Sequence, residues 1–164
     1  KNNYWVKQVR KKNGKVFENG RYQLLVDRDF LILQKCKEVK DESFHIEETT
    51  EEIKTPLPIL FESLPIENHE LIHDKSIAML DKDKLTFPLT LRRWKAGDNF
   101  VPLGMKGKKK LSDFFIDQKV NRFEKDNSWV LTSGNDIVWV INHRIDDRFK
   151  ISDDTKTVYF ARLI

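Results

Sequence analysis

The feature that most limits the fold is a series of short β-branched and aromatic runs, each about as long as one strand. Four of these runs lie in the second half of the chain, at 85–91, 129–132, 137–141 and 157–163. The turn residues of 133–136 separate the middle two. Runs of this length and composition, bounded by turn residues, are typical of strands. The sequence therefore predicts that the second half is β-rich.

The first half has weaker patterns. Segments 15–18 and 21–25 flank Asn19-Gly20, a pair that supplies the positive φ angles of a tight turn and so predicts a hairpin. Residues 30–33 read as a buried strand. Three prolines at 56, 58 and 65 remove backbone donors, which argues against a continuous helix or a central strand over 54–65. We expect a domain boundary near residue 80.

One helix is expected, from about Ser112 to Lys119. Ser112 is suited to cap its first turn, and Leu111 is placed to pack against Ile116. Phe114 and Phe115 then face the core, as does Trp139 from a predicted strand. The predicted fold class is α+β, rich in strands.

Several classes of protein are excluded by simple counts. The longest apolar runs, such as 137–141, are far shorter than the roughly 20 residues that cross a bilayer, so no membrane span is expected. A single cysteine, Cys36, excludes an intrachain disulfide and a four-cysteine zinc site. A reducing, cytoplasmic location fits best. The chain begins at Lys1 without an initiator Met, and we expect it to be a piece of a longer protein.

Charge is distributed unevenly along the chain. The net charge is +4, but 1–80 holds 13 basic and 14 acidic residues, whereas 81–164 holds 17 and 12. Within the second half, 92–122 carries nine basic and three acidic residues. Segment 38–52 has the opposite bias. A cluster of positive charge is typical of a surface that binds a polyanion, although a solvated face has the same composition.

The basic cluster contains a glycine and lysine loop directly before the predicted helix. Gly104 and Gly107 allow the backbone to approach a phosphate closely, and four lysines at 106 and 108–110 add charge. The spacing is neither that of a P-loop nor that of a dinucleotide-binding fold. A nucleic acid backbone is therefore the favoured ligand of this loop.

This region also resembles a known family. The segments 88–105 and 108–115, followed in order by 119–122, 137–140 and 144–149, resemble the C-terminal domain of bacterial tRNA(Ile)-lysidine synthetase. The resemblance covers about 80–164, and it implies a small β-sandwich-like domain with added helices. Residues 81–164 are then the tRNA-recognition domain, and 1–80, which match more weakly, are a connecting β-rich region with an acidic stretch.

The resemblance further implies a parent ligase that adenylates the wobble cytidine of a CAU-anticodon isoleucine tRNA with ATP and then joins lysine to it. In the family this chemistry, with its ATP and Mg²⁺, belongs to an N-terminal PP-loop domain with a Ser-Gly-Gly-x-Asp-Ser motif, which this sequence lacks. The chain alone is therefore expected to contain no catalytic residues, no metal site and no bound cofactor. Its expected partners are the isoleucine tRNA, near the acceptor stem, and the catalytic domain of the same protein.

The candidate tRNA-binding residues all carry positive charge. They are Arg92, Arg93, Lys95, Lys106, Lys108, Lys109, Lys110, Lys119, Arg122, Arg144 and Arg148. The lysines suit phosphate contacts, and arginine can donate two hydrogen bonds to phosphate or guanine. Ion pairs of Arg122, Arg144 and Arg148 with Asp113, Asp146 or Asp147 are an equal alternative. Trp94 could stack on a base, but a tryptophan in a domain of this size is more often a core residue. Asp98 is expected to accept hydrogen bonds from nearby backbone N–H groups.

Two other functions stay open. His69-Glu70-Leu71-Ile72-His73 has the spacing of a zinc hydrolase motif, but Pro65 leaves little room for the helix that this motif needs. The non-catalytic alternative is a protein-docking or dimerisation module. In it the acidic stretch binds another domain, or the chain forms a homodimer.

Overall fold

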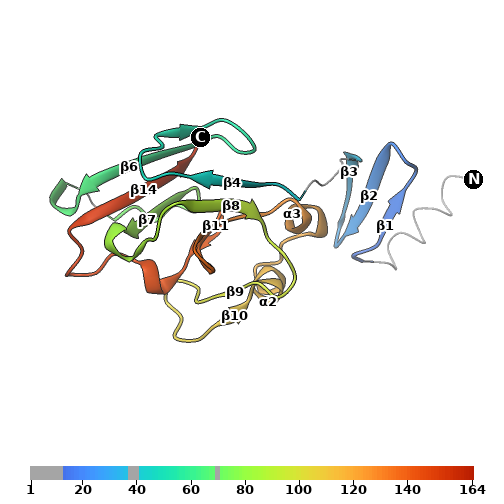
Figure 1. Ribbon diagram of the computed structural model, residues 1–164. Coiled ribbons are helices and arrows are strands. Elements are labelled where there is room, and N and C mark those ends of the chain that lie inside the picture. The colour runs from blue at the N-terminus through green and yellow to red at the C-terminus, as the bar shows by residue number, and fades with distance from the viewer. Residues whose placement is uncertain (1–12, 37–40, 69–70) are drawn as a thin grey trace, which may run out of the picture. The chain divides into compact units, whose positions relative to one another are not determined.

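A computed structural model describes residues 13–36, 41–68 and 71–164. Contacts divide the chain into two compact units, one of residues 1–40 with 117–127 and the other of 41–116 with 128–164 (Figure 1). The boundary expected near residue 80 lies inside the second unit, because strands from both sides of it share the same sheets.

The first unit contains a three-stranded antiparallel sheet in the order β1-β2-β3. Its strands are β1 (Val16–Glu18), β2 (Tyr22–Asp27) and β3 (Phe30–Lys35). The predicted hairpin is confirmed: the Asn19 side-chain oxygen accepts from the Tyr22 N–H at 2.8 Å, and Gly20 has a φ of 82°. The strand expected at 30–33 is present within β3, but the expectation that it is buried was wrong, since Leu31 and Leu33 are exposed. The reason is that β3 is an edge strand of the three-stranded sheet, and the described residues of this unit form no second sheet that covers it.

A helix that the sequence analysis did not predict also belongs to the first unit. Helix α3 (Arg122–Asp126) is capped by Asn121, whose side-chain oxygen accepts from the Glu124 N–H at 3.0 Å. The Glu124 carboxylate accepts in return from the Asn121 N–H at 3.4 Å, which completes a capping box. The spacing of Asn121 and Glu124 was the sequence pattern that could have revealed this helix.

The second unit is built on two antiparallel sheets. The five-stranded sheet, in the order β13-β12-β11-β8-β4, comprises β4 (Ser43–Ile46), β8 (Leu89–Arg93), β11 (Trp129–Ser133), β12 (Asp136–Val140) and β13 (Arg144–Ile145). The four-stranded sheet, in the order β5-β6-β14-β7, comprises β5 (Glu52–Ile53), β6 (Ile59–Pro65), β7 (Ile77–Asp81) and β14 (Thr157–Leu163). The strand-rich α+β prediction is confirmed.

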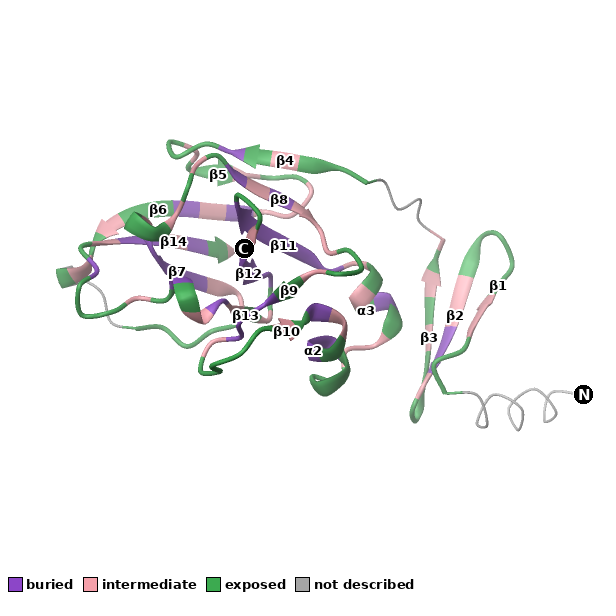
Figure 2. Cartoon of the chain, turned by 60° about the horizontal axis from the view of Figure 1, so that its bottom comes forward, coloured by how far each residue is buried: buried purple, intermediate pink, exposed green. Residues whose placement is uncertain are grey.

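One hydrophobic core joins the two sheets. Alternation along the strands sends Leu131 and Trp139 of the larger sheet and Phe61, Leu80 and Tyr159 of the smaller sheet into the same buried cluster. Figure 2 shows the buried residues concentrated on these central strands. The second unit is therefore a two-layered, sandwich-like domain.

The prolines act differently from the prediction. Strand β6 pairs with β5 on one side and β14 on the other, so it is an interior strand of its sheet. Pro58 lies just before this strand and Pro65 is its last residue. The two residues without an N–H donor therefore lie at the ends of β6, and the hydrogen-bonded pairing of β6 with β14 is continuous between them.

The remaining elements lie at the edge of the sandwich. Strands β9 (Asn99–Phe100) and β10 (Lys109–Lys110) form a short hairpin that leads into helix α2 (Leu111–Asp117). This is the predicted short helix, but it starts one residue early, so that Ser112 lies within it and does not cap it. Ile116 is exposed, so the expected contact with Leu111 does not form. Phe114, Phe115 and Trp139 are buried as predicted.

The described ranges also contain three single-turn 3-10 helices, at Ile66–Asn68, Lys82–Lys84 and Asp147–Phe149. Among the described residues, no helix has the length and apolar character that crossing a membrane requires.

Candidate nucleic-acid interface

The glycine and lysine loop is the connection between β9 and β10, and its base is fixed to the sandwich. The Val101 N–H donates to buried Asp146 at 2.9 Å, and the Leu103 N–H donates to the Ile145 carbonyl at 3.0 Å. The Gly104 N–H donates to the Asp147 carboxylate at 2.9 Å. This hydrogen bond and Lys150 hold the pKa of Asp147 below its usual value. The loop therefore starts from a rigid support.

The lysines of this loop point into solvent. Lys106, Lys108 and Lys110 are exposed, and within the described part of the chain none of the three forms an ion pair with a carboxylate. Lys109 is half-buried where β10 pairs with β9. The loop thus presents at least three ammonium groups whose charge is not neutralised locally, which is what a phosphate backbone requires.

Arg92 is engaged with Asp98 rather than exposed. Its two terminal nitrogens donate to the two Asp98 oxygens, each at 2.9 Å, and one of them also donates to the Arg93 carbonyl. Asp98 accepts in addition from the Lys95 N–H at 2.9 Å, so the expectation that Asp98 binds local backbone donors is confirmed. This bidentate pair fixes the turn that precedes β9 and leaves Lys95 exposed on it.

Arg93 points to the other face of β8. Its guanidinium lies 4.6 Å from the centre of the Trp129 ring, a cation–π distance. Burial lowers the pKa of Arg93. The neighbouring Trp94 packs edge to face on Phe115 of α2, with ring centres 5.4 Å apart. Trp94 is therefore half-buried against the helix, in agreement with a packing role.

The two arginines near the end of β13 are used differently. Arg148 donates from Nε and Nη2 to the buried Asp146 at 3.0 and 2.8 Å, and from Nη1 to Asp136 at 2.9 Å. These bonds raise the pKa of Arg148. Arg144 is exposed and has no ion pair within the described residues. Only Arg144 of these two presents a guanidinium that is not already occupied.

The last two candidates belong to the first unit. Lys119 has a φ of 55°, and its carbonyl accepts a hydrogen bond from Arg28. Arg122 opens α3, and its Nε lies 3.9 Å from an Asp126 oxygen, with both side chains exposed. Lys119 and Arg122 therefore belong to a different unit from the basic residues around the β9–β10 loop.

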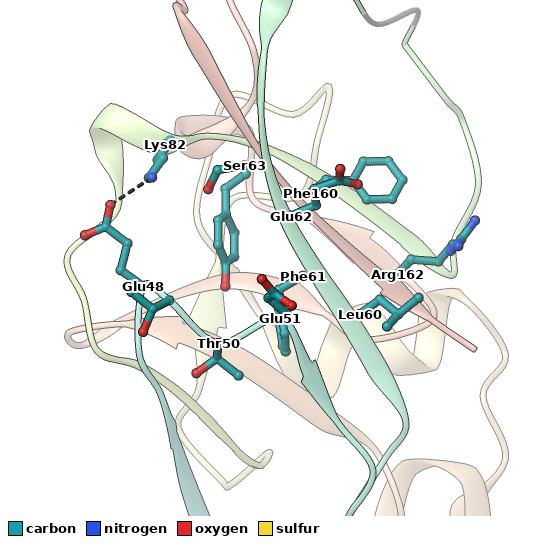
Figure 3. Close-up of a pocket in the computed structure, with 12 residues that line it drawn as sticks. Glu48, Thr50, Glu51, Leu60, Phe61, Glu62, Ser63, Lys82, Phe160 and Arg162 are labelled. Atoms are coloured by element: carbon teal, nitrogen blue, oxygen red, sulfur yellow. Dashed lines mark ion pairs between the residues drawn. The ribbon is translucent and has the colours of Figure 1, made fainter.

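A cavity of about 670 Å³ lies elsewhere in the second unit, beside β6 and β14. Figure 3 shows Glu48, Glu51 and Glu62 around it, with Glu48 joined to Lys82 at 2.8 Å. Three carboxylates repel a phosphate backbone, so this cavity is not part of the interface. Tyr159 also lines it, and its buried hydroxyl has no hydrogen-bond partner in the described structure.

The buried Tyr159 gives a pH-dependent prediction. Burial raises the pKa of Tyr159 in the folded state, and the negative Glu48 adds to the effect. The unfolded tyrosine ionises near pH 10. Above that pH only the unfolded state releases this proton, so the free energy of unfolding is expected to fall by about 1.4 kcal/mol per pH unit from this group. Urea unfolding between pH 9 and pH 11 measures the slope.

Tyr159→Phe is the control for this prediction, because lysines and other tyrosines also titrate in that range. The variant should lose stability less steeply above pH 10, and at pH 7 it should be as stable as the parent or about 1 kcal/mol more stable, since it lacks the unpaired hydroxyl. Equal slopes for the two proteins would show that Tyr159 ionises freely in the folded state.

The zinc alternative has little in the structure to support it. His69 and Glu70 of the His-Glu-x-x-His pattern lie outside the described residues. Residues 71–74 are irregular, and His73 is exposed. In the ranges that the structure describes, no group of three His, Cys, Asp or Glu side chains is placed to hold a metal ion.

Comparisons with known proteins agree with the geometry of this domain. Residues 89–162 match the family described as TilS substrate C-terminal domain. The chain is 43% identical over 155 residues to a tRNA(Ile)-lysidine synthase of Parabacteroides distasonis. The aligned region is 94% of this chain and 35% of that protein. It is 34% identical over 151 residues to the protein of the same name from Bacteroides thetaiotaomicron, and this alignment includes 92% of this chain and 33% of that protein. The chain thus spans about a third of the length of these relatives.

The fold is also that of a solved structure. A structure titled "Crystal structure of TILS C-terminal domain" superposes with a TM-score of 0.61 over 74% of this chain and 95% of that one, at 19% identity. At this identity the likeness concerns the fold. Residues 89–162 therefore match the family described as TilS substrate C-terminal domain, and nearly the whole chain is similar to one part of tRNA(Ile)-lysidine synthases.

Proposed function

We propose that this chain is the tRNA-binding part of a tRNA(Ile)-lysidine synthase. The observation that carries the proposal is the β9–β10 loop, which holds unpaired lysines on a fixed support in a domain of this family. Phosphate contacts from such lysines give affinity and position without reading sequence. The proposed ligand is the isoleucine tRNA with the CAU anticodon, bound near its acceptor stem.

The chemistry of the whole protein is part of the proposal. ATP adenylates the wobble cytidine with release of pyrophosphate, and lysine then displaces AMP to give lysidine. We assign ATP and Mg²⁺ to the catalytic PP-loop domain of the parent protein. In this assignment the present chain selects the tRNA in the cytoplasm and catalyses nothing alone.

The eleven candidate residues fall into three groups by their exposure and ion pairing. The exposed, unpaired side chains are the proposed phosphate contacts: Lys95, Lys106, Lys108, Lys110 and Arg144. Arg92 and Arg148 are bound to carboxylates, so we propose that they shape the interface from within. Arg93, Lys109, Lys119 and Arg122 remain candidates for weaker contacts.

Titration of this chain with the CAU-anticodon isoleucine tRNA and an unrelated tRNA at several salt concentrations tests the proposal. Release of counterions gives a slope of roughly −0.7 to −0.9 in log affinity against log salt for each phosphate neutralised. We expect a slope of about −3 or steeper and tighter binding of the isoleucine tRNA. No binding to either tRNA at low salt would contradict the proposal.

A specific feature of the first unit favours a second candidate, self-association. Strand β3 pairs only with β2 in the described part of the chain, and it exposes 69% of Phe30 and 64% of Leu33. An edge strand with apolar side chains is suited to pair with the same edge of a second copy. The homodimer and the tRNA-binding role are compatible.

Light scattering over a dilution series tests this homodimer. We expect the mass to fall from dimer to monomer on dilution, and Leu31→Asp with Leu33→Asp to give a monomer at every concentration. Ile164→Asp, an equally drastic change at another exposed position, is the control. A parent protein that is monomeric throughout rules the homodimer out.

A further inference from the structure

A second cavity, of about 460 Å³, lies in the sandwich domain next to the base of the lysine loop. Its walls come from residues 71–75, from β7 and from the segment around β13. Strands β7 and β13 lie close to one another in Figure 2. Leu103, three residues before Lys106, is part of its lining and donates its backbone N–H to Ile145, which also lines it. A chain bound along the lysine loop therefore passes close to this cavity.

Most of the lining is apolar. Leu71, Ile72, Met79 and Ile151 contribute aliphatic surface, and Leu71 and Ile72 remain 61% and 48% exposed. The volume lies in the range of sites that hold a small organic group. Large apolar side chains that stay exposed around a hollow mark a place where another molecule is bound.

The same cavity has one buried donor without an acceptor. Trp139 is fully buried and lines the cavity, and its indole Nε1 has no hydrogen-bond partner among the described residues. This nitrogen is itself buried, so a bound molecule meets the indole ring and not the N–H. The ring adds a flat aromatic floor to the aliphatic walls, which suits an apolar, flat group.

The charges at the rim select among such groups. Lys75 and Arg144 are exposed and have no ion pair within the described ranges, and Lys150 is paired with Asp147 outside the cavity lining. Asp74, the one carboxylate of the lining, is engaged by the Ser76 N–H and hydroxyl, each at 2.7 Å. The rim is therefore positive, which favours a group that carries phosphates beside it.

We propose that this cavity receives an unpaired nucleobase from the end of the bound tRNA acceptor arm. The base lies against the aliphatic walls above the Trp139 ring, and Arg144 and Lys75 contact the flanking phosphates. This proposal rests on the proposed function and adds to it a pocket that distinguishes a single-stranded end from a blunt duplex.

The test compares two RNA minihelices that copy the acceptor arm, one with its single-stranded 3′ nucleotides and one blunt. 2-Aminopurine replaces the terminal unpaired adenine, so that its emission reports whether the base is enclosed. The parent chain should bind the minihelix with the overhang at least about tenfold more tightly, since burying one stacked base contributes about that factor or more. The 2-aminopurine emission should change on binding.

Ile72→Asp alters the mouth of the cavity without touching its buried floor. This variant should bind both minihelices with the affinity that the parent has for the blunt one, and the emission change should disappear. Ile164→Asp, the same substitution at another exposed isoleucine, should behave as the parent. Circular dichroism spectra should be the same for all three proteins.

Each other outcome overturns the proposal in a recognisable way. Equal binding of both minihelices without an emission change leaves the tRNA-binding function standing and removes the pocket. No binding of either minihelix at low salt removes both. If AMP binds the chain as tightly as the minihelix does, the cavity is a site for a free nucleotide. If Ile72→Asp changes only the mass measured by light scattering, the cavity is a protein contact.

Discussion

Replacing Lys106, Lys108 and Lys110 together with alanine is expected to weaken tRNA binding by roughly 100-fold or more at 0.1 M salt. The physical reason is that each phosphate neutralised by a lysine contributes about 0.9 to the slope of log affinity against log salt, and this contribution grows as salt falls. All three side chains are exposed and unpaired in the described structure, so their removal breaks no internal contact. The slope should flatten by about 2 to 3.

The matched control for this variant removes the same charge elsewhere. Lys35, Lys54 and Lys156 are also exposed and without an ion pair among the described residues, and their triple alanine variant has the same net charge. If the two variants lose affinity equally, binding depends on total charge and the loop is not the interface. If only the loop variant loses affinity and slope, the loop carries the phosphate contacts.

Asp146→Ala is expected to produce the largest loss of stability, about 3 kcal/mol in the free energy of unfolding. Asp146 is fully buried and accepts from the Val101 N–H, from the Arg148 N–H and from two guanidinium nitrogens of Arg148. Removing it leaves buried donors without acceptors. Arg148 retains Asp136 and is partly exposed, which keeps the loss below that of a fully buried ion pair.

Thermal unfolding followed by tryptophan fluorescence measures this effect, because Trp94, Trp129 and Trp139 all lie in the second unit. A loss of 3 kcal/mol corresponds to a decrease in Tm of roughly 6 to 12 °C for a chain of this size. Asp136→Ala is the control: it removes the exposed partner of the same arginine and should change stability by about 0.5 kcal/mol or less. Equal losses in the two variants would contradict the role assigned to Asp146.

The same network connects stability to the proposed interface. Asp146 and Asp147 bind the backbone of Val101 and Gly104 at the base of the lysine loop. The loop is therefore positioned by carboxylates that lie more than 40 residues later in the sequence. A carboxylate repels a phosphate, but these two carboxylates accept hydrogen bonds from the loop backbone and so hold the loop in place.

Local patterns in the sequence were sufficient for several of the strands and for the distribution of charge. The Asn19-Gly20 hairpin, the strands at 129–133 and 157–163 and the lysine loop before a short helix all depend on neighbouring residues, so their composition predicted them. The resemblance of residues 80–164 to a known family was also readable from the order of its segments, and the family match over 89–162 agrees with it.

Only the tertiary structure decided which elements share a layer and which charges are free. Strand β6 is an interior strand because its prolines stand at its ends. Strand β3 is an exposed edge because the described part of its unit forms a single sheet. Arg92 and Arg148 are bound to carboxylates, whereas Arg144 has no ion pair with any residue in the described ranges, although all three look alike in the sequence. Burial and ion pairing depend on residues brought together from distant parts of the chain, and a single sequence does not record those distances.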